Sequence, residues 1–98
     1  MDELMIPPSA RSDKQARELV RAWVAHGGLH CSLSVDNWGE EERAAWGILL
    51  TDVARHVADA LHKSKNWDKA ETIAEIRRVF NAELDHPTDE PQGKFHTH

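Results

Sequence analysis

Residues 27–35 read Gly-Gly-Leu-His-Cys-Ser-Leu-Ser-Val, and the interpretation of the fold depends on this stretch. From Leu29 onward, apolar and polar side chains alternate, and this period of two indicates a strand with one buried face. The two glycines before it are typical of a helix end, because glycine adopts the left-handed backbone without a Cβ penalty. We therefore expect a helix that ends at Gly27 and a strand over residues 29–35.

The segment before the glycines has the pattern of a helix over residues 12–26. Ser12 and Gln15 have the spacing of a capping box, which satisfies two backbone N–H groups at a helix start. Apolar residues then recur at helical spacing: Ala16, Leu19, Val20, Trp23 and Val24. Residues 1–11 contain Pro7-Pro8 and are expected to be an extended lead-in.

Two further helices are expected after the strand. One runs over residues 40–63 and starts with three glutamates, where the helix dipole favours negative charge. The other runs over residues 67–84, with Asp68 and Glu71 as a second capping box. We assign residues 12–86 to a single globular domain and residues 87–98 to a flexible polar tail.

The expected fold class is α+β, mostly helical, in the order helix, strand, helix, helix. A single strand cannot satisfy its own backbone hydrogen-bonding groups. The strand over residues 29–35 must therefore pair with a short strand at residues 4–6, with a second copy across a homodimer, or with a partner protein.

Composition narrows the classes of function. The chain has 98 residues and a net charge of −5, without a concentrated run of lysine or arginine, which disfavours nucleic acid and anionic membranes as partners. No stretch approaches the roughly 20 apolar residues of a membrane span. The acidic start lacks the basic and apolar regions of a signal peptide. Together with a single cysteine, Cys31, these features lead us to expect a cytoplasmic protein.

Three stretches resemble a family of small bacterial proteins known as a domain of unknown function. They are Gly27–Leu33, Ala45–Leu50 and Asp52–Ala58, and the resemblance covers most of residues 4–88. It implies a bacterial cytoplasmic protein, but it transfers no activity, ligand or site residue.

The polar side of the helix over residues 40–63 is the first candidate site. Asp52, Arg55, His56 and Asp59 are spaced three and four apart and share one face. An aspartate beside a histidine can orient the imidazole for acid–base chemistry. The alternative is a solvated helix face with ordinary ion pairs, and it is favoured because no nucleophile or metal-binding motif accompanies the pair.

Aromatic and histidine residues supply the other candidates. The chain has four tryptophans, of which Trp38 and Trp67 follow turns at helix starts and are expected to be partly exposed, as at binding hot spots. His30 lies on the polar face of the predicted strand. It is adjacent to Cys31, so the two side chains point to opposite faces and cannot easily share a zinc ion. We predict no metal site, no cofactor and no catalytic residue.

Three functions follow from these features. The preferred one is a non-enzymatic interaction module, a homodimer or a partner of another protein. The first alternative is a small-molecule binder or minor enzyme that uses Asp52, His56 and Asp59. The second is a DNA-binding regulator of the ribbon-helix-helix type, since that fold dimerises through a strand followed by two helices.

Overall fold

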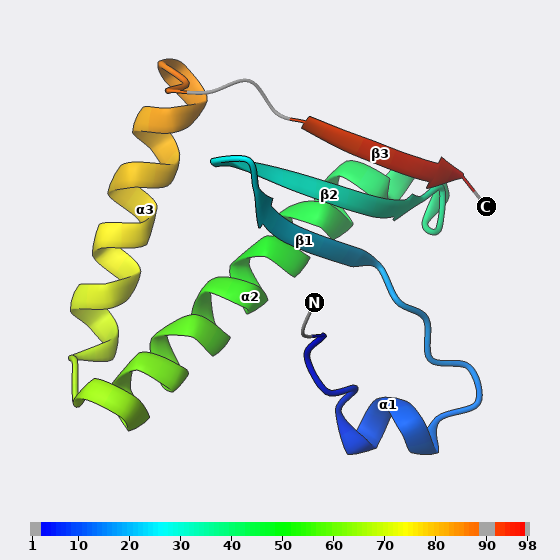
Figure 1. Ribbon diagram of the computed structural model, residues 1–98, viewed down its shortest axis with the longest axis horizontal. Helices are drawn as coiled ribbons and strands as arrows, with labels where there is room; N and C mark the ends of the chain where they lie inside the picture. Colours follow the sequence, from blue (N-terminus) through cyan, green and yellow to red (C-terminus); the bar gives the residue numbers. More distant parts are fainter. Residues whose placement is uncertain (1–2, 89–91, 98) are drawn as a thin grey trace. The chain divides into compact units, whose positions relative to one another are not determined.

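The computed structural model describes residues 3–88 and 92–97, which divide into two compact units. The first unit holds helix α1 (Pro8–Ser12) and the strands β1 (Val20–Ala25), β2 (Gly28–Val35) and β3 (Gln92–Thr97). The second unit holds the 3-10 turn η1 (Gly39–Glu41) and the helices α2 (Glu42–Lys65) and α3 (Lys69–Asp85) (Figure 1). The chain is therefore α+β and mostly helical, as expected.

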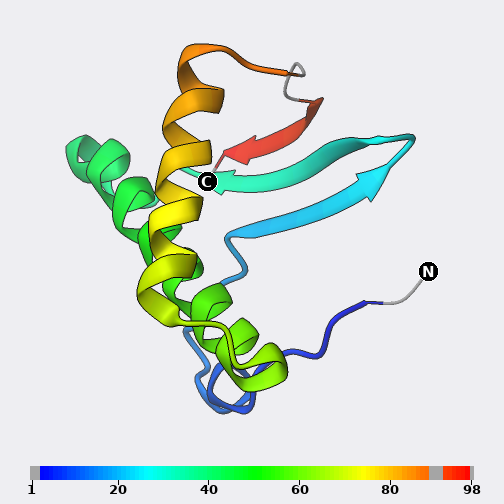
Figure 2. The ribbon, with the colours of Figure 1, turned by 90° about the vertical axis from the view of Figure 1, so that its left-hand side faces the viewer.

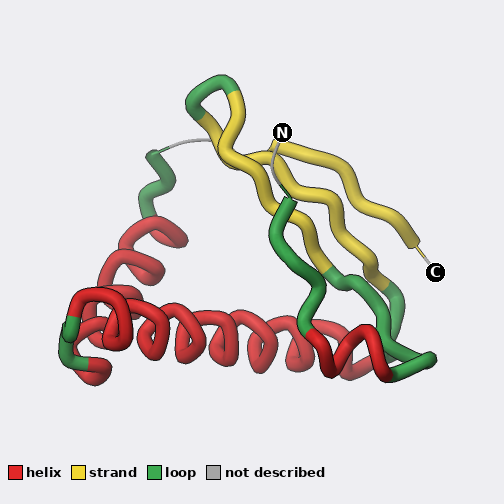
Figure 3. Tube along the Cα trace, turned by 60° about the horizontal axis from the view of Figure 1, so that its bottom comes forward, coloured by secondary structure: helices red, strands yellow, loops and turns green. Residues whose placement is uncertain are grey.

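The first unit is built on a sheet with the strand order β1-β2-β3 (Figures 2 and 3). β1 pairs antiparallel with β2, and β3 pairs parallel with it. The central strand thus has a neighbour on both edges, so the expected pairing of β2 with residues 4–6 or across a dimer is wrong. β3 also lies within the segment that was expected to be a polar tail.

The prediction of a helix over residues 12–26 is wrong, because β1 occupies the second half of this segment. The turn explains the error. His26 and Gly27 have φ values of 51° and 76°, and the flanking residues Ala25 and Gly28 are paired. A two-residue hairpin loop with positive φ at both positions matches the right-handed twist of its strands, and glycine favours it. Gly27 therefore closes a hairpin and does not end a helix.

The helical spacing before Gly27 was an ambiguous signal. The apolar residues at Val20, Trp23 and Val24 fit a helical stripe, yet β-branched and aromatic side chains also suit a strand. The short helix α1 lies further upstream, in the expected lead-in, with Pro8 in its first turn. Proline is tolerated there because the first N–H groups of a helix have no partner within it.

The register sets the two faces of the β1–β2 hairpin. Paired residues share a face, so apolar residues gather on one side: Val20, Ala22, Val24, Leu29, Cys31 and Leu33. The alternation of apolar and polar side chains along β2 is thus as expected. Near the turn, however, the apolar face is exposed to solvent, since Val24 is 84% and Leu29 55% exposed. The buried residue of this strand is Ser34, on the polar face.

The second unit follows the sequence prediction closely. The expected helices over residues 40–63 and 67–84 correspond to α2 and α3 within about two residues at each end. α2 ends at Asn66, whose φ of 57° is the left-handed conformation that terminates helices. Asp68 caps α3, since its Oδ2 accepts a hydrogen bond of 2.9 Å from the Glu71 backbone N–H.

This cap gives a first prediction. Asp68→Ala removes the acceptor from the first turn of α3 and is expected to lower the free energy of unfolding by about 1 kcal/mol. Asp68→Asn is the control, because asparagine caps equally well and should lose only a few tenths of that amount. Urea unfolding followed by circular dichroism measures both variants. Equal losses in the two variants would show that the cap is not what stabilises this end.

The two long helices contact each other near their connection and diverge from it (Figure 1). Ala58 is 2% exposed, and it is the one buried hydrophobic residue among residues 3–88. Within residues 3–88 and 92–97, no helix combines the length and apolar composition needed to cross a membrane.

Candidate functional site

Glu42, the first residue of α2, fixes the chain that enters this helix. One carboxylate oxygen accepts hydrogen bonds from the backbone N–H groups of Asn37 at 2.9 Å and Trp38 at 3.0 Å. The other accepts from the Asp36 N–H at 3.2 Å and from the indole Nε1 of Trp46 at 2.7 Å. Four donors from a turn and a helix thus converge on one side chain.

These contacts determine the charge of Glu42. Desolvation, the largest single influence, acts to raise the pKa of its carboxyl group. The hydrogen bonds from Trp46 and from the three backbone groups act in the opposite sense and together prevail, so the pKa is lowered from its ordinary value. The carboxylate is therefore ionised at neutral pH and holds the loop by charge-assisted hydrogen bonds.

Sequence reasoning did not identify this role of Glu42. The three glutamates at the start of α2 were interpreted only through the helix dipole. The available signal was the spacing of four between Glu42 and Trp46, which places the two side chains on the same face of a helix. The backbone donors of residues 36–38 depend on the turn geometry, and Asp36 there has a φ of 66°.

The carboxylate of Glu42 sets the position of two tryptophans. The rings of Trp38 and Trp46 meet edge to face, with centroids 6.4 Å apart and planes at 87°. Aromatic pairs favour this arrangement because the positive edge of one ring meets the negative face of the other. Trp38, a predicted site residue, is half-buried.

A shallow groove of about 450 Å³ lies beside this pair on α2. Its lining is mostly apolar, with two polar residues among the seven: Trp38, Ala45, Ile48, Leu49, Asp52, Val53 and His56. The structure thus brings three of the predicted site residues, Trp38, Asp52 and His56, to one concave surface.

The other predicted residues of this helix face make ion pairs. Arg55 lies 3.8 Å from Asp52, and Lys69 of α3 lies 3.1 Å from Asp59. The hydrogen bond and charge of Lys69 lower the pKa of Asp59. Both aspartates therefore pair with a cation, whereas the catalytic interpretation paired them with His56. All four partners are at least half exposed, so each pair contributes little to stability.

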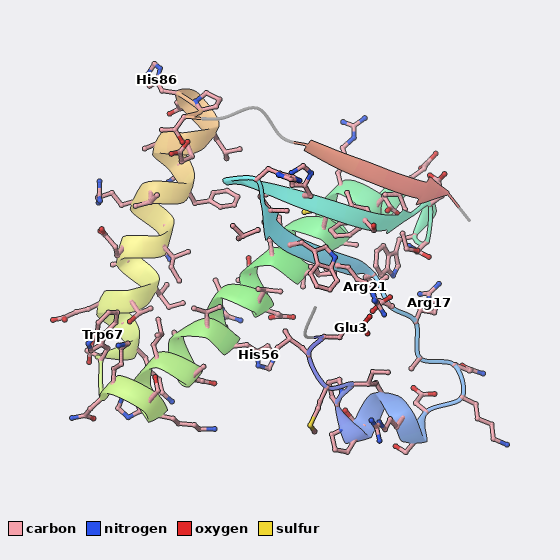
Figure 4. All side chains as sticks on the ribbon, in the orientation of Figure 1. Glu3, Arg17, Arg21, His56, Trp67 and His86 are labelled. Atoms are coloured by element: carbon pink, nitrogen blue, oxygen red, sulfur yellow. The ribbon has the colours of Figure 1, made fainter. Side chains whose placement is uncertain are left out.

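Trp67 and His30 do not line the groove. Trp67 is 53% exposed at the α2–α3 connection, as its position after a turn predicts (Figure 4). The Nζ of Lys65 lies 5.5 Å from its ring centroid, within the range of a cation–π contact. His30 belongs to the first unit, where it is paired with Trp23 across the hairpin.

The first unit contains one further charged cluster. Arg21 of β1 binds Glu18 at 2.8 Å and lies 3.6 Å from Glu3, which links the N-terminal segment to the sheet (Figure 4).

Residues 3–88 contain no group of three histidine, cysteine or acidic side chains placed to hold a metal ion.

Comparison with known proteins places this architecture in a wider group. A family model described as a domain of unknown function, DUF5076, matches residues 3–88. A solved structure named a candidate pyruvate dehydrogenase, from the photosynthetic bacterium Rhodopseudomonas palustrus CGA009, is 32% identical in sequence. The match covers 92% of this chain and 90% of that chain, with a TM-score of 0.68. Among curated proteins, no match was found.

Proposed function

This chain belongs to the DUF5076 family, and we propose that it is a non-enzymatic interaction module whose first partner is a second copy of itself. One observation carries the proposal. Among residues 3–88, Ala58 is the one hydrophobic residue that is buried, while many large apolar side chains are exposed.

Exposed apolar side chains occur in each unit taken by itself: Val24 and Leu29 on the hairpin, and Leu50, Val53 and Phe80 on the long helices. Exposed apolar surface of this kind marks sites of protein–protein interaction.

The alternatives have weaker support. A ribbon-helix-helix dimer requires a free edge on the strand that precedes the two helices, but β2 is paired on both edges. The catalytic alternative needs a carboxylate to orient His56, but Asp52 and Asp59 pair with Arg55 and Lys69. The groove on α2 still favours a small-molecule binder as the second candidate function, since Trp38, Asp52 and His56 all line it.

The name of the 32% identical structure suggests a probe for this second candidate. Titration with pyruvate, followed by tryptophan fluorescence, would report on a ligand beside Trp38. Binding that is lost in His56→Ala would support a small-molecule site. An unchanged spectrum at millimolar pyruvate would count against this ligand.

Sedimentation equilibrium at micromolar concentration tests the preferred function. We expect a particle of twice the 11.1 kDa chain mass at all concentrations in this range. A particle of the monomer mass, with native circular dichroism, would refute the proposed self-association.

A further inference from the structure

Within the described part of the chain, β1 is an edge strand, because the strand order is β1-β2-β3 (Figure 2). The N-terminal segment reaches β1 through the ion pair of Glu3 and Arg21, but among residues 3–88 no backbone hydrogen bond joins the two segments. The register with β2 is continuous from Val20 to Ala25, so β1 contains no bulge, and it contains no proline. Natural edge strands commonly use bulges and prolines to prevent further pairing. The outer edge of β1 is therefore open to another strand.

The hydrogen bonds of the hairpin identify the backbone groups at this edge. The Ser34 N–H donates a hydrogen bond of 2.9 Å to the carbonyl of Leu19, and this pair continues the register of the hairpin. Hydrogen-bonded and non-hydrogen-bonded pairs alternate along an antiparallel ladder. Counting from Leu19, every second residue of β1 therefore bonds to β2. The N–H and C=O groups that point outward belong to the residues between them: Val20, Ala22 and Val24.

We propose that this edge pairs antiparallel with β1 of a second copy, about a two-fold axis at Ala22, so that one sheet crosses the dimer. The inference rests on the proposed self-association and identifies its interface. In this register the outward backbone groups of the two copies meet. Ala22 faces its own counterpart, and Val20 of each copy faces Val24 of the other.

The sequence of β1 complements itself in this register. On one face, a valine pair lies on either side of the two alanines, and β-branched side chains suit such cross-strand contacts. On the other face, Arg21 meets Trp23 of the second copy, and guanidinium groups stack favourably on indole rings. Arg21 is the one charged residue of β1, so no like charges lie directly opposite each other.

Neighbouring registers lack this complementarity. An axis at Arg21 would place two arginines opposite each other. An axis at Trp23 would place Val20 opposite His26, whose φ of 51° belongs to the turn and not to a strand. A strand that complements itself favours a second copy over an unrelated strand, and its pattern favours the axis at Ala22.

Cysteine cross-linking tests the register. Ala22 and Cys31 are paired in the hairpin, so the test uses chains that also carry Cys31→Ser. In this background, Ala22→Cys brings two thiols to the axis, where the paired Cα atoms would lie about 5.5 Å apart, within disulfide range. Mild oxidation is expected to convert this variant to a covalent dimer on non-reducing electrophoresis.

Val24→Cys in the same background is the matched control. Val24 is strongly exposed, so random collision would favour its oxidation. In the proposed register, however, the two copies of Val24 lie about 13 Å apart along the strands, too far for a disulfide. This variant is expected to remain uncross-linked. Equal cross-linking of the two variants would overturn the register.

A proline at the axis tests the backbone pairing in solution. Ala22→Pro removes an outward N–H and leaves the hydrogen bonds to β2 in place, because edge strands tolerate proline on their open side. This variant is expected to sediment as a monomer under conditions where the wild-type chain is a dimer. Ala22→Ser keeps the N–H and is expected to remain a dimer.

These outcomes separate the inference from the proposed function. A wild-type dimer whose Ala22→Cys variant does not cross-link, or whose Ala22→Pro variant stays dimeric, would overturn the β1 interface and leave the proposed function standing. A monomeric wild-type chain would refute both. If Ala22→Pro does not fold, the two cysteine variants decide, because neither of them removes a backbone donor.

Discussion

Gly27→Val is expected to lower the free energy of unfolding by about 1–3 kcal/mol, because valine cannot easily adopt a positive φ. Gly27 has a φ of 76°, and among the described residues, its two chain neighbours aside, no atom lies within 4 Å of the position that a Cβ would occupy. The cost is therefore one of backbone strain and not of steric overlap with a neighbour. Urea unfolding, followed by tryptophan fluorescence, measures it, since Trp23 lies on β1 beside the turn.

Gly27→Asn provides the control for this prediction. Asparagine tolerates the left-handed region far better than valine, so the variant should retain most of the wild-type stability. If valine and asparagine cost the same amount, or if valine costs nothing, the hairpin turn at residues 26 and 27 would not have the conformation described.

Glu42→Gln is expected to lower the Tm by several degrees and to shift the tryptophan emission. Glutamine keeps the shape of the side chain but loses its charge, and one of its two terminal groups is a donor that cannot accept from the loop N–H groups or from the indole of Trp46. Glu41→Gln is the matched control. Glu41 is the neighbouring residue, and its carboxylate makes none of these four contacts. Equal thermal shifts in the two variants would contradict the role assigned to Glu42.

The effect of Glu42 is expected to depend on pH. Its pKa in the folded chain is lowered from the ordinary value of 4.5, so the ionised form favours folding. This contribution is fully present above the unfolded pKa and is lost as the pH falls through the folded pKa. The difference in Tm between the wild type and Glu42→Gln should therefore be largest at pH 7 and shrink below about pH 4.5. A constant difference down to pH 3 would exclude the ionic explanation.

The helical half of the fold was predictable from the sequence because its determinants are local. The Asp68 cap, the apolar stripes and the left-handed Asn66 lie within a few residues of the boundaries that they set. The family was also recognised from short stretches, in agreement with the match over residues 3–88.

The sheet was not predictable in the same way. β3 pairs with β2 across more than 50 residues of chain, and no local pattern encodes such a contact. β1 was misassigned because a short apolar run fits both a helical and a strand period. Only the left-handed backbone at His26 and Gly27 distinguishes the two.

The same division between local and tertiary contacts applies to the candidate site. The shared face of Asp52 and His56 follows from helix geometry, and the structure places both in one groove. The partner of Asp59 is Lys69 of another helix, and that contact requires the tertiary fold. The role of Glu42 requires a turn whose backbone conformation the sequence does not specify.

The central claim is the proposed self-association of the chain. Urea unfolding of the wild-type chain at two protein concentrations 100-fold apart tests it most directly. If folding requires association, the apparent free energy of unfolding should rise by roughly 2.7 kcal/mol at the higher concentration, and the midpoint should rise with it. The same midpoint at both concentrations would show that the chain folds alone and would contradict the claim.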